Sequence, residues 1–118
     1  MQLDYVDLYI IHWPSGYWNG KIPLHVLWPK LEALVDQNLT KSIGISNFNI
    51  QLVADLLTYA RIKPVVNQIE LHPLNPQTEL VKFLVDNDIQ PVAYCPIAKA
   101  EETDFATAIV DIKEAPDL

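Results

Sequence analysis

Four short runs of aliphatic residues recur along the 118-residue chain, and each run ends at a polar or aromatic side chain. The clearest run extends from Val6 to Ile11 and stops at His12. Near-continuous aliphatic runs are typical of the strands of parallel sheets, which are buried on both faces. The runs begin about 25–35 residues apart, and segments with an apolar spacing of about 3.6 residues separate them. This alternation predicts an α/β fold built from βαβ units.

The spacing predicts strands over residues 6–12, 41–45, 65–70 and 91–95, and helices that carry the apolar residues of 26–35, 52–60 and 80–85. We expect Asn38 to end the first helix and Pro29 to lie near its start, where proline is tolerated. Either Asn47 or Asn49 is expected to cap the second helix, and Thr78 the third.

The charge and composition of the chain argue against several classes of binding partner. The formal net charge of -7 argues against binding of nucleic acid or of an anionic membrane through a basic surface. Cys95 is the single cysteine, so an intrachain disulfide is excluded. No apolar run approaches the roughly 20 residues of a membrane span, and the first residues lack the basic start of a signal peptide. We therefore expect a cytoplasmic protein with no nucleic-acid or membrane partner.

Several polar residues at the strand ends have structural alternatives to a functional role. A histidine such as His12 can be satisfied by backbone, Ser46 and Asn47 can cap a helix, and Tyr94 can pack in a core. The three histidines and one cysteine show no metal-ligand spacing, so we expect no metal site. With three glycines, the chain also lacks a glycine-rich phosphate loop.

Four segments, taken in this order, resemble the aldo-keto reductase family. They are Leu3–Pro14, Lys41–Phe48, Asn67–Pro73 and Pro91–Ile97. The resemblance covers roughly residues 1–100 and implies a partial (β/α)8 TIM barrel of about four parallel βα units, because a complete barrel needs about 250 residues. We interpret residues 1–118 as one partial aldo-keto reductase domain, in which residues 101–118 form a tail without a predicted structure.

The resemblance implies a function: NADPH-dependent reduction of aldehydes and ketones to alcohols by hydride transfer. His12 resembles the catalytic histidine of the family, which orients and polarises the substrate carbonyl. Hydrogen bonds to the nicotinamide carboxamide are made in the family by residues that Ser46, Asn47 and Gln68 resemble. Tyr94 resembles the aromatic residue that stacks on the nicotinamide ring.

The substrate side of the implied site rests on aromatic residues. Trp13 resembles an aromatic of the family's substrate pocket, and Tyr17 and Trp18 in the same loop are expected to line that pocket. The resemblance therefore implies two ligands, which are NADPH and a small-molecule carbonyl substrate.

The chain also departs from the family pattern. The family's catalytic set includes an Asp, a Tyr and a Lys, and we find no counterpart of these three in the sequence. We therefore expect the chain alone to be inactive and interpret it as a fragment of a longer reductase. The alternative is a non-catalytic half-barrel that serves as an interaction or assembly module, with self-association through its exposed sheet edges.

Overall fold

Strands and helices alternate strictly in the computed structural model, which describes residues 3–14 and 22–98. The strands are β1 (Val6–Ile11), β2 (Thr40–Ser46), β3 (Val66–Glu70) and β4 (Gln90–Tyr94), and the helices are α1 (Leu24–Asp36), α2 (Ile50–Tyr59) and α3 (Thr78–Asp86). All neighbouring strands pair in parallel, in the order β1-β2-β3-β4. The predicted architecture of about four parallel βα units, a part of an α/β barrel, is confirmed. The expected tail of residues 101–118 lies outside the described residues.

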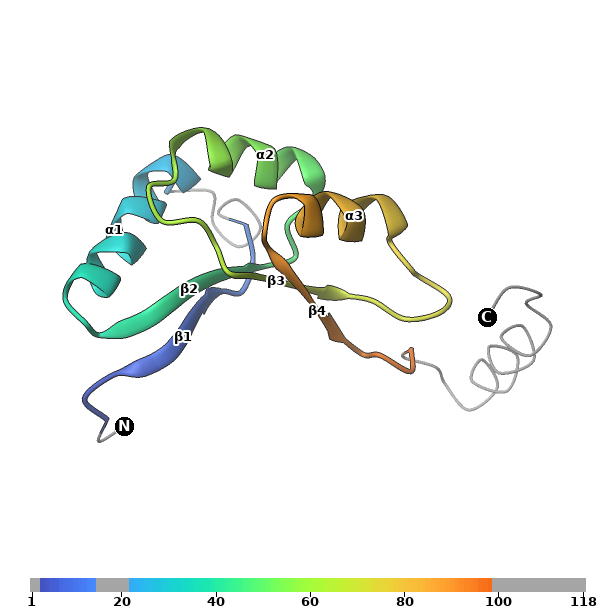
Figure 1. Cartoon of the computed structure of the whole chain (residues 1–118), viewed down its shortest axis with the longest axis horizontal. Helices are drawn as coiled ribbons and strands as arrows, with labels where there is room; N and C mark the ends of the chain where they lie inside the picture. Colours follow the sequence, from blue (N-terminus) through green and yellow to red (C-terminus); the bar gives the residue numbers. More distant parts are fainter. Residues whose placement is uncertain (1–2, 15–21, 99–118) are drawn as a thin grey trace.

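The three helices cover one face of the sheet through a single apolar core (Figure 1). Ile43 and Ile45 of β2 point into this core and are completely buried, as is Trp28 of α1. Burying one side chain of this size contributes about 1.5–3 kcal/mol. The indole Nε1 of Trp28 donates a hydrogen bond of 3.0 Å to the carbonyl oxygen of Ile62, so the largest core side chain leaves no polar atom unpaired. Packing of Ile43 and Ile45 against the helices therefore determines which face of β2 points toward the core.

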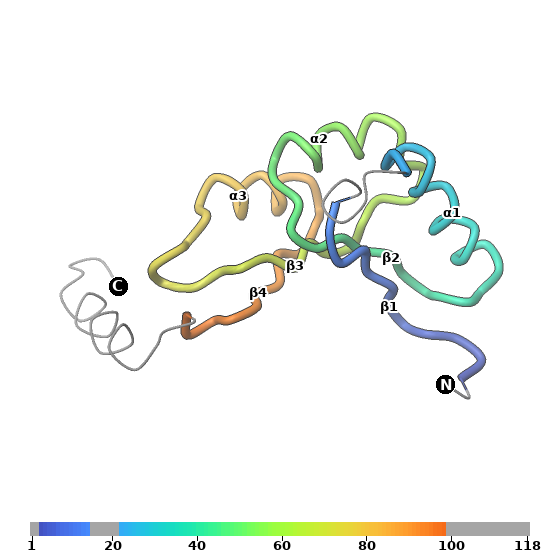
Figure 2. The backbone as a smooth tube through the Cα atoms, turned by 180° about the vertical axis from the view of Figure 1, so that it is seen from behind, coloured from blue at the N-terminus to red at the C-terminus, as the bar shows by residue number. Residues whose placement is uncertain are grey.

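The opposite face of the sheet carries no helix among the described residues; in Figure 2, which views the chain from behind, all three helices again lie on one side of the strands. Leu8 of the edge strand β1 pairs with Ser42 on this face and is 38% exposed. Gly44, two residues further along β2 and paired with Ile10, lies close to β3: a Cβ atom added there would lie 2.6 Å from Val66 Cγ2. The absence of a side chain at Gly44 thus lets β2 and β3 approach closely at this point.

Asparagines end α1 and cap α2, as the sequence predicted. Asn38 adopts the left-handed conformation (φ 57°) just after α1, and the Leu39 N–H bonds to the Leu34 carbonyl at 2.9 Å, which closes the helix. Asn49, rather than Asn47, caps α2, because its Oδ1 accepts the Leu52 N–H at 2.9 Å.

Three local predictions were wrong in detail. Thr78 is the first residue of α3 and not its cap; Gln77 occupies the cap position in a left-handed conformation (φ 43°) and makes no side-chain cap. Pro29 lies inside α1, beyond its first turn. β4 ends at Tyr94 because Cys95 turns into the left-handed region (φ 50°) and leaves the extended conformation. The other strand bounds differ from the prediction by one residue at most at each end.

In the part of the chain that the structure describes, no helix has the length and apolar character needed to cross a membrane.

The close approach at Gly44 predicts a stability effect. We expect Gly44→Ala to lower the free energy of unfolding by roughly 1–3 kcal/mol, because the new methyl group overlaps Val66 Cγ2. Urea unfolding with an unchanged m-value measures this loss. The Val66→Ala substitution removes the clashing methyl, so the double variant should be less destabilised than the sum of the two single variants. Strict additivity would contradict the proposed clash.

Candidate functional site

The carboxyl ends of the four strands lie along one edge of the sheet, and the predicted site residues gather there. His12 directly follows β1, Ser46 ends β2, Asn47 comes next, Gln68 lies in β3 and Tyr94 ends β4. Parallel pairing brings these positions together, because all carboxyl ends then share one edge, where α/β proteins bind ligands. We call these five residues the rim cluster.

Hydrogen bonds of the Asn47 side chain join three members of the rim cluster. Its Nδ2 donates to the His12 carbonyl oxygen at 2.9 Å and to Ser46 Oγ at 3.1 Å. Its Oδ1 accepts the Tyr94 hydroxyl at 2.8 Å. Asn47 itself is in the left-handed conformation, with φ 63°, which asparagine tolerates better than most residues. One side chain therefore contacts groups at the ends of β1, β2 and β4.

The remaining bonds of the cluster run to β3. Ser46 is 2% exposed, and its hydroxyl donates to the Gln68 carbonyl oxygen at 2.7 Å. The backbone N–H of Asn47 donates to the same oxygen at 3.0 Å. Ser46 and Asn47 thus hold the sheet edge together, and neither caps α2. The half-buried Gln68 side chain makes no hydrogen bond to the described residues.

A shallow cleft of about 260 Å³ opens beside the cluster. Trp13, Asn47, Glu70, Gln77 and Tyr94 contribute to its walls. The indole of Trp13 stacks on the exposed imidazole of His12, with ring centroids 5.7 Å apart. Tyr94 is half-buried and faces this cleft, which differs from the core packing considered as its alternative. Tyr17 and Trp18, the other expected pocket residues, lie outside the described residues.

A buried amide beside the cluster has a structural role that was not predicted from the sequence. Asn67 of β3 is completely buried. Its Nδ2 donates to the Phe48 carbonyl at 2.9 Å, and its Oδ1 accepts the Phe48 N–H at 3.4 Å. The two contacts fix the chain as it leaves β2. The available sequence signal was an amide directly after the apolar pair Val65 and Val66.

The loop after β3 is held by its own polar residues. Asn75 and Gln77 both donate side-chain hydrogen bonds to the Glu70 carbonyl oxygen. The Glu70 carboxylate lies 3.2 Å from His72 Nε2, and the side chain of His72 is largely buried. His72 therefore ties this loop to the end of β3, and it does not line the cleft.

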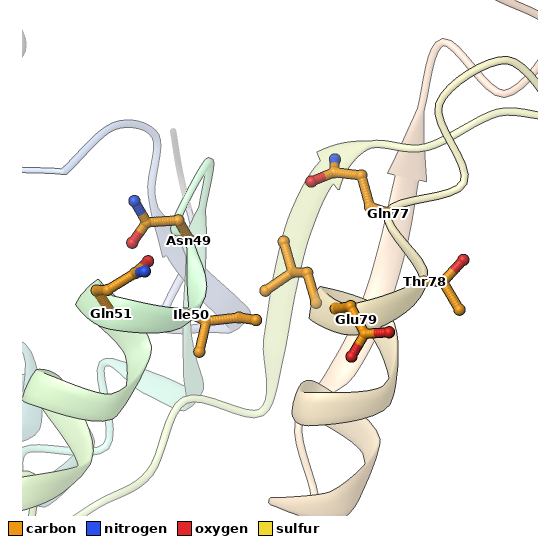
Figure 3. A pocket seen from close by; sticks show the side chains of 7 residues that line it. Asn49, Ile50, Gln51, Gln77, Thr78 and Glu79 are labelled. Atoms are coloured by element: carbon orange, nitrogen blue, oxygen red, sulfur yellow. The ribbon is translucent and has the colours of Figure 1, made fainter.

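A second hollow, of about 350 Å³, separates the first turns of α2 and α3. Figure 3 shows Asn49, Ile50 and Gln51 on its α2 side. The α3 side carries Gln77 and Thr78, and Ile50 points across from α2. Asn49 and Gln77 border both hollows, so the rim cleft and this hollow adjoin each other.

Most of the charged pairs lie away from the rim cluster. Lys41, near the start of β2, contacts Asp7 Oδ1 at 2.7 Å, and hydrogen bonds from this ammonium to Asp7 and Tyr5 raise the pKa of Lys41 above its ordinary value. No group of three metal-ligating side chains occurs among the described residues. The rim chemistry is therefore carried by amide, hydroxyl, imidazole and aromatic groups.

Comparison with known proteins identifies the family. The family model for the aldo/keto reductase family matches residues 1–111. The chain belongs to the aldo/keto reductase family.

Individual relatives agree with this assignment. Aldose reductase C of Dictyostelium discoideum is 38% identical, over 92% of this chain and 40% of the relative. The structure of an aldose reductase from Giardia lamblia superposes with a TM-score of 0.76 at 43% identity and covers 86% of this chain and 39% of that one. A structure of a silkworm (Bombyx mori) aldo-keto reductase complexed with NADPH gives a TM-score of 0.71 at 40% identity, covering 78% of this chain and 29% of that one. The chain spans 35% to 40% of the length of the curated relatives that it matches.

The buried amide below the cluster predicts a second stability effect. We expect Asn67→Ala to lower the free energy of unfolding by roughly 1–3 kcal/mol, because it leaves the Phe48 N–H and carbonyl without their partner. Gln51→Ala, which truncates an exposed amide on α2, is the matched control and should stay within about 0.5 kcal/mol of wild type. Equal urea midpoints for the two variants would show that the Asn67 contacts contribute nothing.

Proposed function

We propose that this chain forms the nicotinamide-binding side of an NADPH-dependent reductase that converts aldehydes and ketones to alcohols. The rim cluster is the observation that carries the proposal, because it combines an aromatic ring, amide and hydroxyl groups and an imidazole at the carboxyl edge of a parallel sheet. The complex of a similar reductase with NADPH supports this choice of coenzyme.

The residues present suit a nicotinamide. Its carboxamide has one acceptor and two donor hydrogens, so hydroxyl and amide side chains are its natural partners. Gln68 has both its amide donor and its amide acceptor uncommitted among the described residues, and Asn47 Oδ1 retains capacity for a second donor. The ring of Tyr94 borders the cleft, where it can stack on a planar aromatic ligand. Ser46 would hold its neighbours in place through the Gln68 carbonyl.

NADPH, when bound, supplies the hydride. In the proposed reaction the exposed imidazole of His12 donates a hydrogen bond to the carbonyl oxygen of a small-molecule substrate and so stabilises the negative charge that develops there. Trp13, stacked on His12, forms a wall of the same cleft. We expect the 118-residue chain to bind the coenzyme without appreciable turnover, because acid–base groups contribute about 10²–10⁴-fold and no counterpart of the family's Asp, Tyr and Lys was found.

Fluorescence titration of NADPH with the purified 118-residue chain tests this function. We expect saturable binding that is roughly fivefold weaker in Tyr94→Ala, since offset stacking contributes about 1 kcal/mol. Gln68→Ala should also weaken binding, because it removes the amide expected to pair with the carboxamide.

Each variant has a control of the same residue type away from the cleft. Tyr9→Ala removes an exposed tyrosine of β1, and Gln90→Ala removes an exposed glutamine at the start of β4. Both should bind NADPH like the wild-type chain. A wild-type chain that shows a folded circular dichroism spectrum and no saturable NADPH binding would refute the proposed function.

A second candidate function is a non-catalytic assembly module. The supporting observation is the exposure of apolar side chains on the edge strand β1, where Leu8 is 38% and Tyr9 is 49% exposed. Size-exclusion chromatography separates the two candidates. A stable dimer without NADPH binding favours the module, and a monomer that binds NADPH favours the reductase.

A further inference from the structure

We propose that Asn47 is a positioning residue that couples the end of β1 at His12 to the phenol of Tyr94 on β4. We call its side-chain contacts with His12, Ser46 and Tyr94 the rim clamp. The inference rests on the proposed function, in which His12 and Tyr94 flank the reacting atoms. It assigns to Asn47 a role through its neighbours, beyond that of a direct partner of the carboxamide.

The hydrogen-bonding capacity of Asn47 carries the argument. An asparagine amide has two donor hydrogens, and both are used within the protein, one on the His12 carbonyl at 2.9 Å and one on Ser46 Oγ at 3.1 Å. Its oxygen already accepts the Tyr94 hydroxyl at 2.8 Å. Asn47 can therefore accept one further bond from a ligand, but it cannot donate one without giving up a contact of the clamp.

The backbone holds this amide rigidly. The Asn47 N–H donates to the Gln68 carbonyl at 3.0 Å, and the residue is fixed in the left-handed region at φ 63°. Asn49 caps α2, so the Asn47 amide is not needed for that purpose. Its side chain is thus anchored on β3 through the backbone while it contacts groups at the ends of β1 and β4.

Such a clamp organises the ring of Tyr94 in advance of ligand binding. β4 is an edge strand of the described sheet, so pairing on one side only restrains its end. The hydroxyl bond to an immobile acceptor restricts the ring, and a restricted ring loses less freedom when it stacks on a ligand. The hydroxyl of Tyr94 should therefore matter for NADPH binding even though stacking uses only the ring.

Two-dimensional NMR of the 118-residue chain tests the coupling without any coenzyme. Tyr94→Phe removes only the hydroxyl and should shift the His12 backbone and ring signals. In an Asn47→Gly background, the same change should leave the His12 signals in place; glycine is chosen because it accepts φ 63° without strain. Tyr59→Phe is the matched control, since it removes a hydroxyl bonded to Asp55 in α2 and should not move His12.

A second background keeps the test usable if Asn47→Gly fails to fold. Asn47→Asp retains an oxygen for Tyr94 and lacks both donor hydrogens, so the Tyr94→Phe change should again leave His12 unmoved. An unchanged His12 in Tyr94→Phe, an equal shift in the variant backgrounds, or a wild-type chain without dispersed signals would each overturn the rim clamp.

NADPH titration of the same variants separates this inference from the proposed function. Tyr94→Phe and Asn47→Gly should each weaken binding roughly 2- to 12-fold, the range expected for one hydrogen bond. The double variant should bind NADPH no more weakly than whichever single variant binds it less tightly, because both substitutions break the same rim clamp. A full product of the two effects counts against the clamp. Coupling in the NMR spectra without NADPH binding would leave the clamp standing and remove the proposed function.

Discussion

The junction between β2 and β3 connects the two halves of the sheet and determines how the rim cluster is assembled. The two strands pair only where Ile45 meets Asn67 and Ser46 meets Gln68, whereas β3 pairs with β4 along the whole length of Val66–Glu70. Close to this short pairing, the absence of a side chain at Gly44 leaves room for Val66. The junction joins β1 and β2 to β3 and β4, so its geometry sets how the ends of the two strand pairs lie relative to each other.

Side chains supplement the few backbone contacts of this junction. Ser46 bonds the Gln68 carbonyl, and the buried amide of Asn67 bonds both backbone groups of Phe48. These contacts occur at the carboxyl edge, where Asn47 and Phe48, the residues held by these bonds, line the cleft beside Tyr94. Structural and proposed binding roles therefore overlap in the same polar groups. Substitutions at this edge consequently require stability controls before any loss of binding is assigned to a lost ligand contact.

Much of this arrangement could be predicted from the sequence. Aliphatic runs, helical spacing and parallel pairing follow from local periodicity, and they sufficed to place His12, Gln68 and Tyr94 at one edge. The choice between Asn47 and Asn49 as helix cap could not be made, because both asparagines precede the helix and only backbone conformation separates them. Asn47 takes φ 63°, which directs its amide to the sheet edge. The role of Asn67 was also missed, since periodicity does not identify the buried backbone group that an amide will contact.

Amide hydrogen exchange of the 118-residue chain tests most directly whether the β2–β3 junction holds the rim together. The Asn47 N–H, which bonds the Gln68 carbonyl at 3.0 Å, is the reporter. We predict that this amide exchanges as slowly as the interior amides of β2, because it becomes free only when the junction opens. Exchange of the Asn47 N–H at the rate of an unfolded peptide, while β2 stays protected, would show that the β2–β3 junction does not hold the rim together.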